Sequence, residues 1–407
     1  MVFKSQFEKA LDEVSRPGED WRKAIEPLDD FEIVLASDAS ALCRAIEALS
    51  AHPELLSKPP ENSSPGRAYR VAVFFQQVAS QEAQQMLGIE GLPRLQKLYD
   101  VLYAAKDRDI QSLLFILKVF SMYGSEGGAA RIVQAARDGF EQGEYTWEVI
   151  LRSMGDPEHP CARKVFDELS QPLPPDFIGM AMLDAVNQFI IAGGSGKHPF
   201  DSAEGKARLE KFLIDRNEEQ LSGAHSATSA LPFISEPERG RLLALAMDHA
   251  SVTVQMEAAW ASGKMGNERG VALLTKFCRD IHRSGAARAY LEDLGLEDAI
   301  PEDCNDPDFQ AMAEMSQWLQ HPNEYGRAPE KLELYDSREL YWPPTDDRRN
   351  VWLFKYTFPP KEPGAEPDVG IGMTGSVTFA LFGEVNSSLP PERIYALHCA
   401  WELQGNE

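Results

Sequence analysis

The sequence predicts a mainly α-helical chain, with an α-solenoid of about six helix pairs followed by a small α+β domain. Three observations support this prediction. A short phrase recurs every 31 to 45 residues along the middle of the chain, apolar residues after most copies share one helical face, and the pattern changes to aromatic strands after Pro301. A repeat of that length is typical of stacked arrays, in which each unit buries its apolar face against its neighbours.

Each copy of the phrase begins with an anchor, followed by two spacers and a basic or apolar residue. Clear copies begin at Gly91, Gly128, Gly205 and Gly270, and weaker copies begin at Pro160 and Arg239. Apolar residues follow at positions +4, +7 and +8, which form one face of a helix. The Pro160 copy fits only after a shift of one residue. Each anchor therefore predicts the second helix of a pair, after an apolar helix that ends in a tight glycine turn.

Composition divides the chain into four segments. Residues 1–66 are predicted as a helical N-terminal cap, 67–300 as the array, 301–340 as a connecting helix and linker, and 341–407 as a small α+β module. Loops are expected at 58–66 and 361–368, and a turn at 341–347.

Within the last segment, three apolar runs predict strands. They are residues 351–358, 369–373 and 376–382. A helix is expected from Leu389, and residues 398–403 either continue it or form a last strand. Alternation predicts that only one face of 351–358 is buried.

The helix pairs, their glycine turns and their period resemble HEAT repeats. Residues 251–274, with the pair Ala258 and Ala259 and the turn glycines Gly263 and Gly266, are similar to the bacterial HEAT-like type. This resemblance covers about residues 67–300 and implies an α-solenoid. It implies no single function, because such repeats serve many unrelated roles.

Charge and composition exclude several classes of partner. The formal net charge of −24 argues against a nucleic-acid-binding protein and against an anionic membrane surface. The chain has no run of 18 apolar residues, and its charged N-terminus lacks the apolar core of a secretory signal. Its five cysteines are scattered, which predicts reduced thiols and a cytoplasmic location.

Motifs that resemble catalytic signatures fail on their context. Residues 370–375 match GxGxxG, but a proline-rich loop precedes them and a β-rich run follows, so a glycine-rich strand or bulge is expected. Residues 193–198 depart from the phosphate-loop spacing and predict a loop between helices. None of the eight histidines is followed by Glu or has metal-ligand spacing, unlike those of the iron-dependent hydroxylases built on HEAT repeats. We therefore expect no catalytic, cofactor-binding or metal-binding residues.

The first candidate for partner binding is a column of arginines three residues after four of the anchors. Its members are Arg94, Arg131, Arg163 and Arg208. One interpretation is a basic ladder that grips an acidic partner. The other is structural: an acid precedes every anchor, where it suits the helix dipole, and the arginines bridge neighbouring units. HEAT units commonly carry such a ladder, and this column resembles it.

The second candidate is a group of aromatic residues near the end of the chain, which includes Trp342, Trp352 and Trp401. Aromatic side chains dominate small cores, and an exposed remainder would form a recognition patch.

The sequence thus favours a non-enzymatic scaffold or adaptor that binds a protein partner through the concave face of the solenoid, the aromatic module, or both. The alternative is an enzyme or enzyme-assisting chaperone of the bilin lyase-like HEAT type. A HEAT-like DNA-repair glycosylase is disfavoured, because it needs a basic cleft. The sequence leaves the oligomeric state open.

Overall fold

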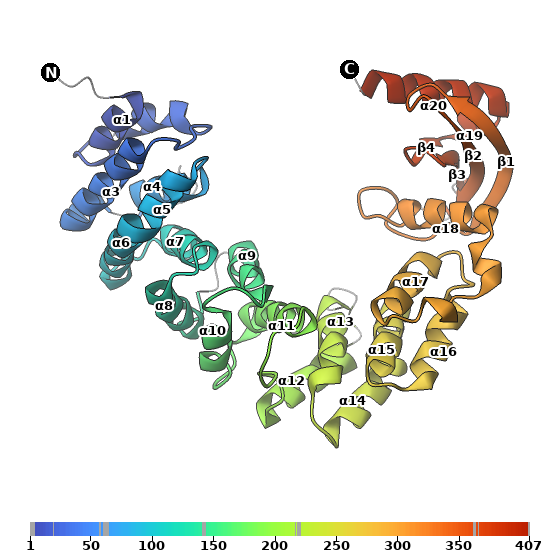
Figure 1. Cartoon of the computed structure of the whole chain (residues 1–407), viewed down its shortest axis with the longest axis horizontal. Coiled ribbons are helices and arrows are strands. Elements are labelled where there is room, and N and C mark those ends of the chain that lie inside the picture. Colours follow the sequence, from blue (N-terminus) through green and yellow to red (C-terminus); the bar gives the residue numbers. More distant parts are fainter. Residues whose placement is uncertain are drawn as a thin grey trace. The chain divides into compact units, whose positions relative to one another are not determined.

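The computed structural model describes residues 5–18, 20–56, 58–59, 65–140, 144–215, 217, 221–360, 364 and 366–405. Parts of the two loops predicted at 58–66 and 361–368 lie outside these ranges. The chain divides into two compact units, residues 1–245 and 246–407. It is mainly α-helical, with one small antiparallel sheet near its C-terminal end (Figure 1), so the predicted fold class is confirmed at this level.

The first unit is made of helices. They are α1 (Gln6–Val14), α2 (Asp20–Ile25), α3 (Ala36–Ala51), α4 (Arg67–Val73), α5 (Gln81–Met86), α6 (Leu92–Ala104), α7 (Ile110–Met122), α8 (Glu126–Arg137), α9 (Glu144–Arg152), α10 (Ala162–Glu168), α11 (Asp176–Ile191), α12 (Ala203–Ile214) and α13 (Leu221–Ala230), with α14 (Glu238–Met247) at the boundary between the units. A π-helical turn, Leu87–Gly91, joins α5 to α6.

Helices of this unit pack in two rows. In one row α4 contacts α7, α7 contacts α9, α9 contacts α11, and α11 contacts α13. In the other row α3 contacts α6, α6 contacts α8, and α8 contacts α10 (Figure 1). Each helix therefore covers one side of the next helix in its row, which allows a chain of short amphipathic helices to share a continuous core.

The anchors mark the first turns of helices in the second row and in the second unit. Gly128 and Gly205 stand three residues after the N-cap residues Ser125 and Ser202, whose hydroxyls accept hydrogen bonds from the glycine N–H groups at 3.1 and 3.0 Å. Asn267, three residues before Gly270, caps its helix in the same way through Arg269 N–H at 3.0 Å. The repeated phrase thus includes a capping residue that the sequence analysis did not recognise.

The expected apolar face is buried in α8, where Ile132, Ala135 and Ala136 are all inaccessible. In α10 the burial of Val165 and Leu169 confirms the shift of one residue. In α14 the buried residues are Leu242 and Ala246 rather than Leu243 and Met247, so this weak copy is also displaced by one residue.

Four helices precede the sheet in the second unit. They are α15 (Val252–Lys264), α16 (Glu268–Phe277), α17 (Ser284–Asp293) and α18 (Pro307–Leu319), and each packs on the next. The sheet has the order β1 (Lys331–Trp342), β2 (Asp347–Phe358), β3 (Asp368–Thr374) and β4 (Phe379–Phe382), with every neighbouring pair antiparallel. Helices α19 (Glu384–Ser387) and α20 (Pro391–Gly405) follow.

The prediction that only one face of residues 351–358 is buried is wrong. Phe354, Tyr356 and Phe358 pack against α18, whereas Val351 and Leu353 pack on the opposite side against α20. Figure 1 shows these two helices on opposite faces of the sheet. Both faces of β2 are therefore in a core, because a helix covers each of them.

Two further expectations for this region need correction. Residues 331–342, expected as part of a linker, form the edge strand β1, and the strand expected at 376–382 spans only Phe379–Phe382. The predicted turn before β2, the strand at 369–373 and a helix that continues through residues 398–403 are confirmed. Residues 370–374 of the GxGxxG match lie within β3, as expected of a glycine-rich strand.

The close approach of α8 to α7 yields a stability prediction. A Cβ atom on Gly128 would lie 2.3 Å from Cβ of Phe120, whereas one on the adjacent Gly127 would meet only the flexible end of Gln96. We expect Gly128→Ala to lower the free energy of unfolding by about 1–3 kcal/mol. Gly127→Ala is the matched control and should be neutral, or stabilising by up to about 1 kcal/mol, because alanine favours helix. Urea unfolding followed by circular dichroism measures both, and equal stability of the two variants would contradict the expected clash.

Candidate functional site

The four candidate arginines lie in the first half of α6, α8, α10 and α12, and all of them are engaged within the chain. Arg94 donates to the carbonyl oxygen of Glu90 at 2.8 Å and forms ion pairs with Glu47 at 3.4 Å and with Glu90 at 3.3 Å. Glu47 belongs to α3, the preceding helix of the row. This arginine therefore joins two neighbouring helices.

Arg131 forms the best-defined bridge of the column. Its Nε and Nη2 atoms donate to the two carboxylate oxygens of Asp100 on α6 at 2.8 and 2.5 Å, and its Nη1 donates to the carbonyl oxygen of Gly127 at 2.6 Å. Two parallel hydrogen bonds to one carboxylate fix the guanidinium in orientation as well as in position. The bridging acid is Asp100 rather than the acid that precedes an anchor.

Arg208 joins two helices through backbone carbonyls. It donates to the carbonyl oxygens of Leu173 at 3.1 Å and of Pro174, just before α11, and to the Glu204 carboxylate at 2.6 Å. The guanidinium thus holds the entry to α11 against α12.

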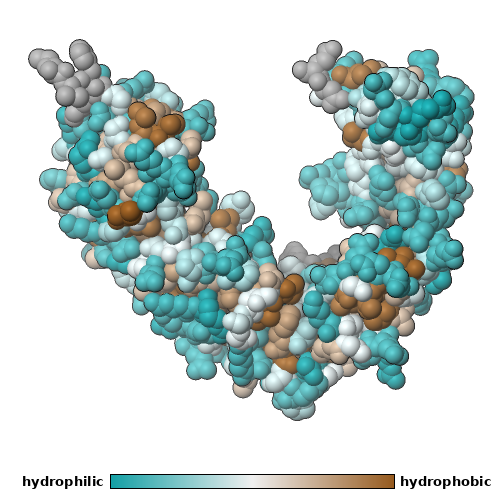
Figure 2. All heavy atoms as spheres, in the orientation of Figure 1, coloured by the Kyte–Doolittle hydropathy of each residue, from teal (hydrophilic) through white to brown (hydrophobic). Residues whose placement is uncertain are grey.

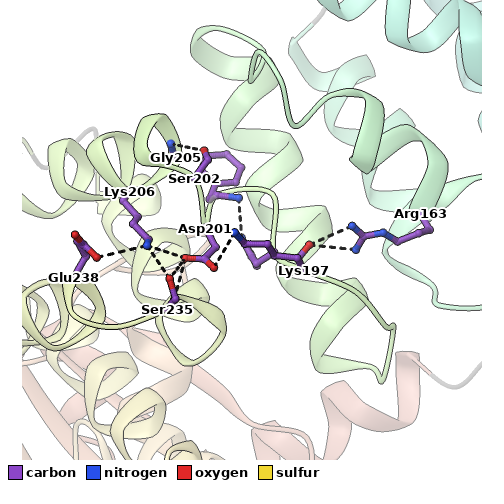
Figure 3. Close-up of polar contacts among 10 residues, drawn as sticks. Arg163, Lys197, Asp201, Ser202, Gly205, Lys206, Ser235 and Glu238 are labelled. Atoms are coloured by element: carbon purple, nitrogen blue, oxygen red, sulfur yellow. Dashed lines mark hydrogen bonds and ion pairs between the residues drawn. The ribbon is translucent and has the colours of Figure 1, made fainter.

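Arg163 contacts a polar cluster between α11 and α14. Besides Asp167 on its own helix, it donates to the carbonyl oxygens of Ser195 at 3.3 Å and Lys197 at 3.2 Å. Figure 3 shows this contact beside the side chain of Asp201. Residues 193–198, which match part of a phosphate loop, are thus held by an arginine of the neighbouring unit.

Asp201 is the centre of that cluster (Figure 3). It is buried and accepts hydrogen bonds from the N–H and hydroxyl groups of Ser235 at 2.9 and 2.7 Å, and it forms ion pairs with Lys206 at 3.0 Å and Lys197 at 3.4 Å. Burial raises the pKa of Asp201, but the hydrogen bonds from Ser235 and Lys206 outweigh it and hold this pKa well below its usual range. The carboxylate is therefore a structural anion that ties the loop before α12 to the loop before α14.

Next to this cluster, His198 is buried as a neutral ring. Its Nδ1 accepts a hydrogen bond from Phe200 N–H at 3.1 Å, so Nε2 carries the proton and donates to Asn187 Oδ1 at 3.1 Å. Asn187 in turn donates to the Ser226 carbonyl oxygen on α13 at 2.8 Å. Burial lowers the pKa of His198 to about 3, with Asp201 opposing the shift. The histidine is thus part of the packing between units.

The three candidate tryptophans have different environments. Trp342 is buried and its Nε1–H donates to the buried Glu402 carboxylate at 2.9 Å. Trp352 is half-buried and donates to Asp308 at the start of α18 at 2.6 Å. Trp401 alone is exposed, at 46%, and its ring stacks on Phe379 with the centroids 4.7 Å apart. The structure does not bring the three rings together into one patch.

Exposed apolar side chains surround Trp401. Leu397, one turn earlier in α20, is 45% exposed, and Leu403 and Val377 are also exposed. We call the group Val377, Leu397, Trp401 and Leu403 the α20 patch. Figure 2 shows that the surface is mostly hydrophilic and that apolar side chains gather in separate areas.

Two hollows on the first unit were not foreseen from the sequence. A groove of about 440 Å³ crosses α4, α7 and α9, and its lining includes Tyr69, Phe115, Lys118 and Tyr145. A cavity of about 780 Å³ lies between α11 and α12 and includes Arg208 in its lining. The groove had a sequence signal, since α7 is apolar almost all round and therefore places Phe115 on its accessible side.

Comparison with known proteins gives no functional lead: neither a protein-family model nor a curated protein matches the chain. Among the described residues, no three His, Cys, Asp or Glu side chains lie close enough together to hold a metal ion. In the same part of the chain, no helix combines the length and the apolarity needed to cross a membrane.

Because of its low pKa, His198 should make stability depend on pH. The unfolded chain binds a proton near the ordinary value of 6.5, whereas the folded chain does so only near 3, so the free energy of unfolding should fall as the pH drops below 6.5. Between pH 7 and pH 5 this loss amounts to about 2 kcal/mol. We expect His198→Gln to remove it, so the variant loses less stability over that interval. Urea unfolding at the two pH values measures the difference.

The matched control is His52→Gln, because His52 is exposed at the surface. It should keep the pH dependence of the unchanged chain. A His198 variant with that same dependence would show that the folded chain already accepts the proton at pH 5.

Proposed function

We propose that this chain is a HEAT-like α-solenoid scaffold or adaptor, non-enzymatic and cytoplasmic, that binds a protein partner. Support for the array comes from the first unit, where two rows of helices pack in sequence order and arginines join neighbouring helices. Stacked arrays of this type expose long surfaces, and such surfaces commonly bind other proteins.

The α20 patch is the observation that best supports partner binding. The outermost element of a soluble array needs a polar outer face, yet α20 exposes Leu397, Trp401 and Leu403. Tryptophan is enriched among residues that dominate binding energy at interfaces. Stacking on Phe379 holds the ring of Trp401, so little rotamer entropy is lost when a partner covers it.

The groove across α4, α7 and α9 is a second candidate surface. The rings of Tyr69 and Phe115 lie 4.5 Å apart, and Tyr145 is 76% exposed beside them. A concave apolar lining with a few polar groups is typical of binding sites.

Point substitutions test these surfaces better than truncation does. A chain that ends near Pro329 would lose the whole sheet, and with it the partner of α18, whose Met315 and Leu319 pack against β2. Loss of binding by that fragment would then report exposed core as much as a missing recognition element.

We expect Trp401→Ala to remove a partner that the full-length chain captures from its native host. The test is affinity capture read by mass spectrometry, followed by direct binding of the purified partner. Loss of a central interface tryptophan costs roughly 2 kcal/mol or more, which lowers affinity at least about thirtyfold. Val385→Ala is the matched control, because this exposed apolar residue of α19 is not part of the α20 patch.

Tyr145→Ala separates the two surfaces. If this variant loses the partner while Trp401→Ala keeps it, the groove carries binding instead. If the unchanged chain captures no specific protein, or if reproducible turnover is found and is lost on a point substitution, the scaffold proposal fails.

The bilin lyase-like alternative has its own test. Under the scaffold proposal, co-expression of the chain with a tetrapyrrole should give a colourless protein, because no chromophore is retained. Absorbance of the purified protein in the visible range measures this, and a coloured product would favour the alternative.

A further inference from the structure

The cavity between α11 and α12 has the composition of a ligand site. Its volume of about 780 Å³ falls within the range of small-molecule pockets. Phe177 and Met180 of α11 and Phe212 of α12 are half-buried in its lining, and Phe200 is fully buried there. The lining therefore offers aromatic and thioether surface from both helices to one occupant.

The charges around the cavity are not balanced in the same way. Arg208 is neutralised by Glu204 at 2.6 Å and is held by backbone carbonyls. Asp215 accepts a hydrogen bond from Asn217 N–H at 3.0 Å, and Asp176 is exposed in the first turn of α11, where the helix dipole favours a carboxylate. Lys211 remains: it lines the cavity, and no described residue forms a hydrogen bond or ion pair with its ammonium group.

We propose that this cavity binds a small amphipathic anion, with an apolar body of two or three rings between Phe177, Met180 and Phe212 and an acidic group at Lys211. Charge complementarity selects this occupant: a neutral apolar molecule would leave the ammonium group without a partner, and a cation would be repelled by it. The site is separate from the protein-binding surfaces proposed above, and it would add a small-molecule input to a scaffold.

The first unit also contains an internal comparison for this site. The groove across α4, α7 and α9 is aromatic too and contains one lysine, but Lys118 donates to Gln76 at 3.4 Å and lies 5.3 Å from the centroid of the Phe115 ring. Its cation is thus already engaged, whereas that of Lys211 is free to bind an anion.

The test uses the full-length chain and two fluorescent probes. 8-Anilino-1-naphthalenesulfonate has an apolar body and one sulfonate, and N-phenyl-1-naphthylamine has the same ring system without the charge. We expect one saturable site for the sulfonate probe, with affinity lowered about tenfold by Lys211→Met, the size of one charge-assisted hydrogen bond. The uncharged probe should bind both proteins equally, and Phe177→Ala should weaken both probes.

Lys118→Met is the matched control and should leave both affinities unchanged. Circular dichroism spectra and melting temperatures of all variants establish that they fold. Three results would overturn the proposal: no saturable binding of the sulfonate probe, binding that Lys211→Met leaves intact, or an equal loss in Lys118→Met. None of these results bears on capture of a protein partner through Trp401.

Discussion

Close contact between the two helices of a pair is the constraint on which the array depends. At Gly128 an added Cβ would meet the side chain of Phe120, at Gly205 the backbone of Phe200, and at Gly270 the carbonyl oxygen of Ala259. Each glycine brings the start of the second helix against the end of the preceding helix or turn. The pair then shares one apolar stripe, and the remaining apolar faces can be covered only by the next pair. The rows of the first unit follow from this need.

The repeated helices could be predicted from the sequence because glycine spacing and helical periodicity agree there. The sheet could be predicted only in part. β1 contains Glu333, Asp336, Arg338 and Glu339, and such charge is typical of an edge strand that resists pairing with other chains, so it was interpreted as a linker. Lys355 suggested that one face of β2 is exposed, but its ammonium lies 3.8 Å from the centroid of the Tyr335 ring, which lets a charged side chain stand beside a core.

The candidate residues show a similar division. Spacing was sufficient to place the four arginines on corresponding helices and to suggest that they bridge units. It could not reveal that Arg163 and Arg208 bind backbone carbonyls, because those carbonyls belong to loops distant in sequence. Nor could it distinguish the tryptophans: which of Trp342, Trp352 and Trp401 remains exposed depends on which helix covers each strand, and both α18 and α20 do so.

The double role of α18 has a consequence for synthesis of the chain. This helix packs on α17 and also covers β2, so its own core is complete only when the sheet has formed. The last strand ends at Phe382, 63 residues after Leu319. At ordinary rates of translation, Met315, Trp318 and Leu319 leave the ribosome roughly 3 to 13 seconds before the last strand. During that interval a nascent chain exposes a greasy helix with nothing to cover it, and a holdase chaperone would find its substrate there.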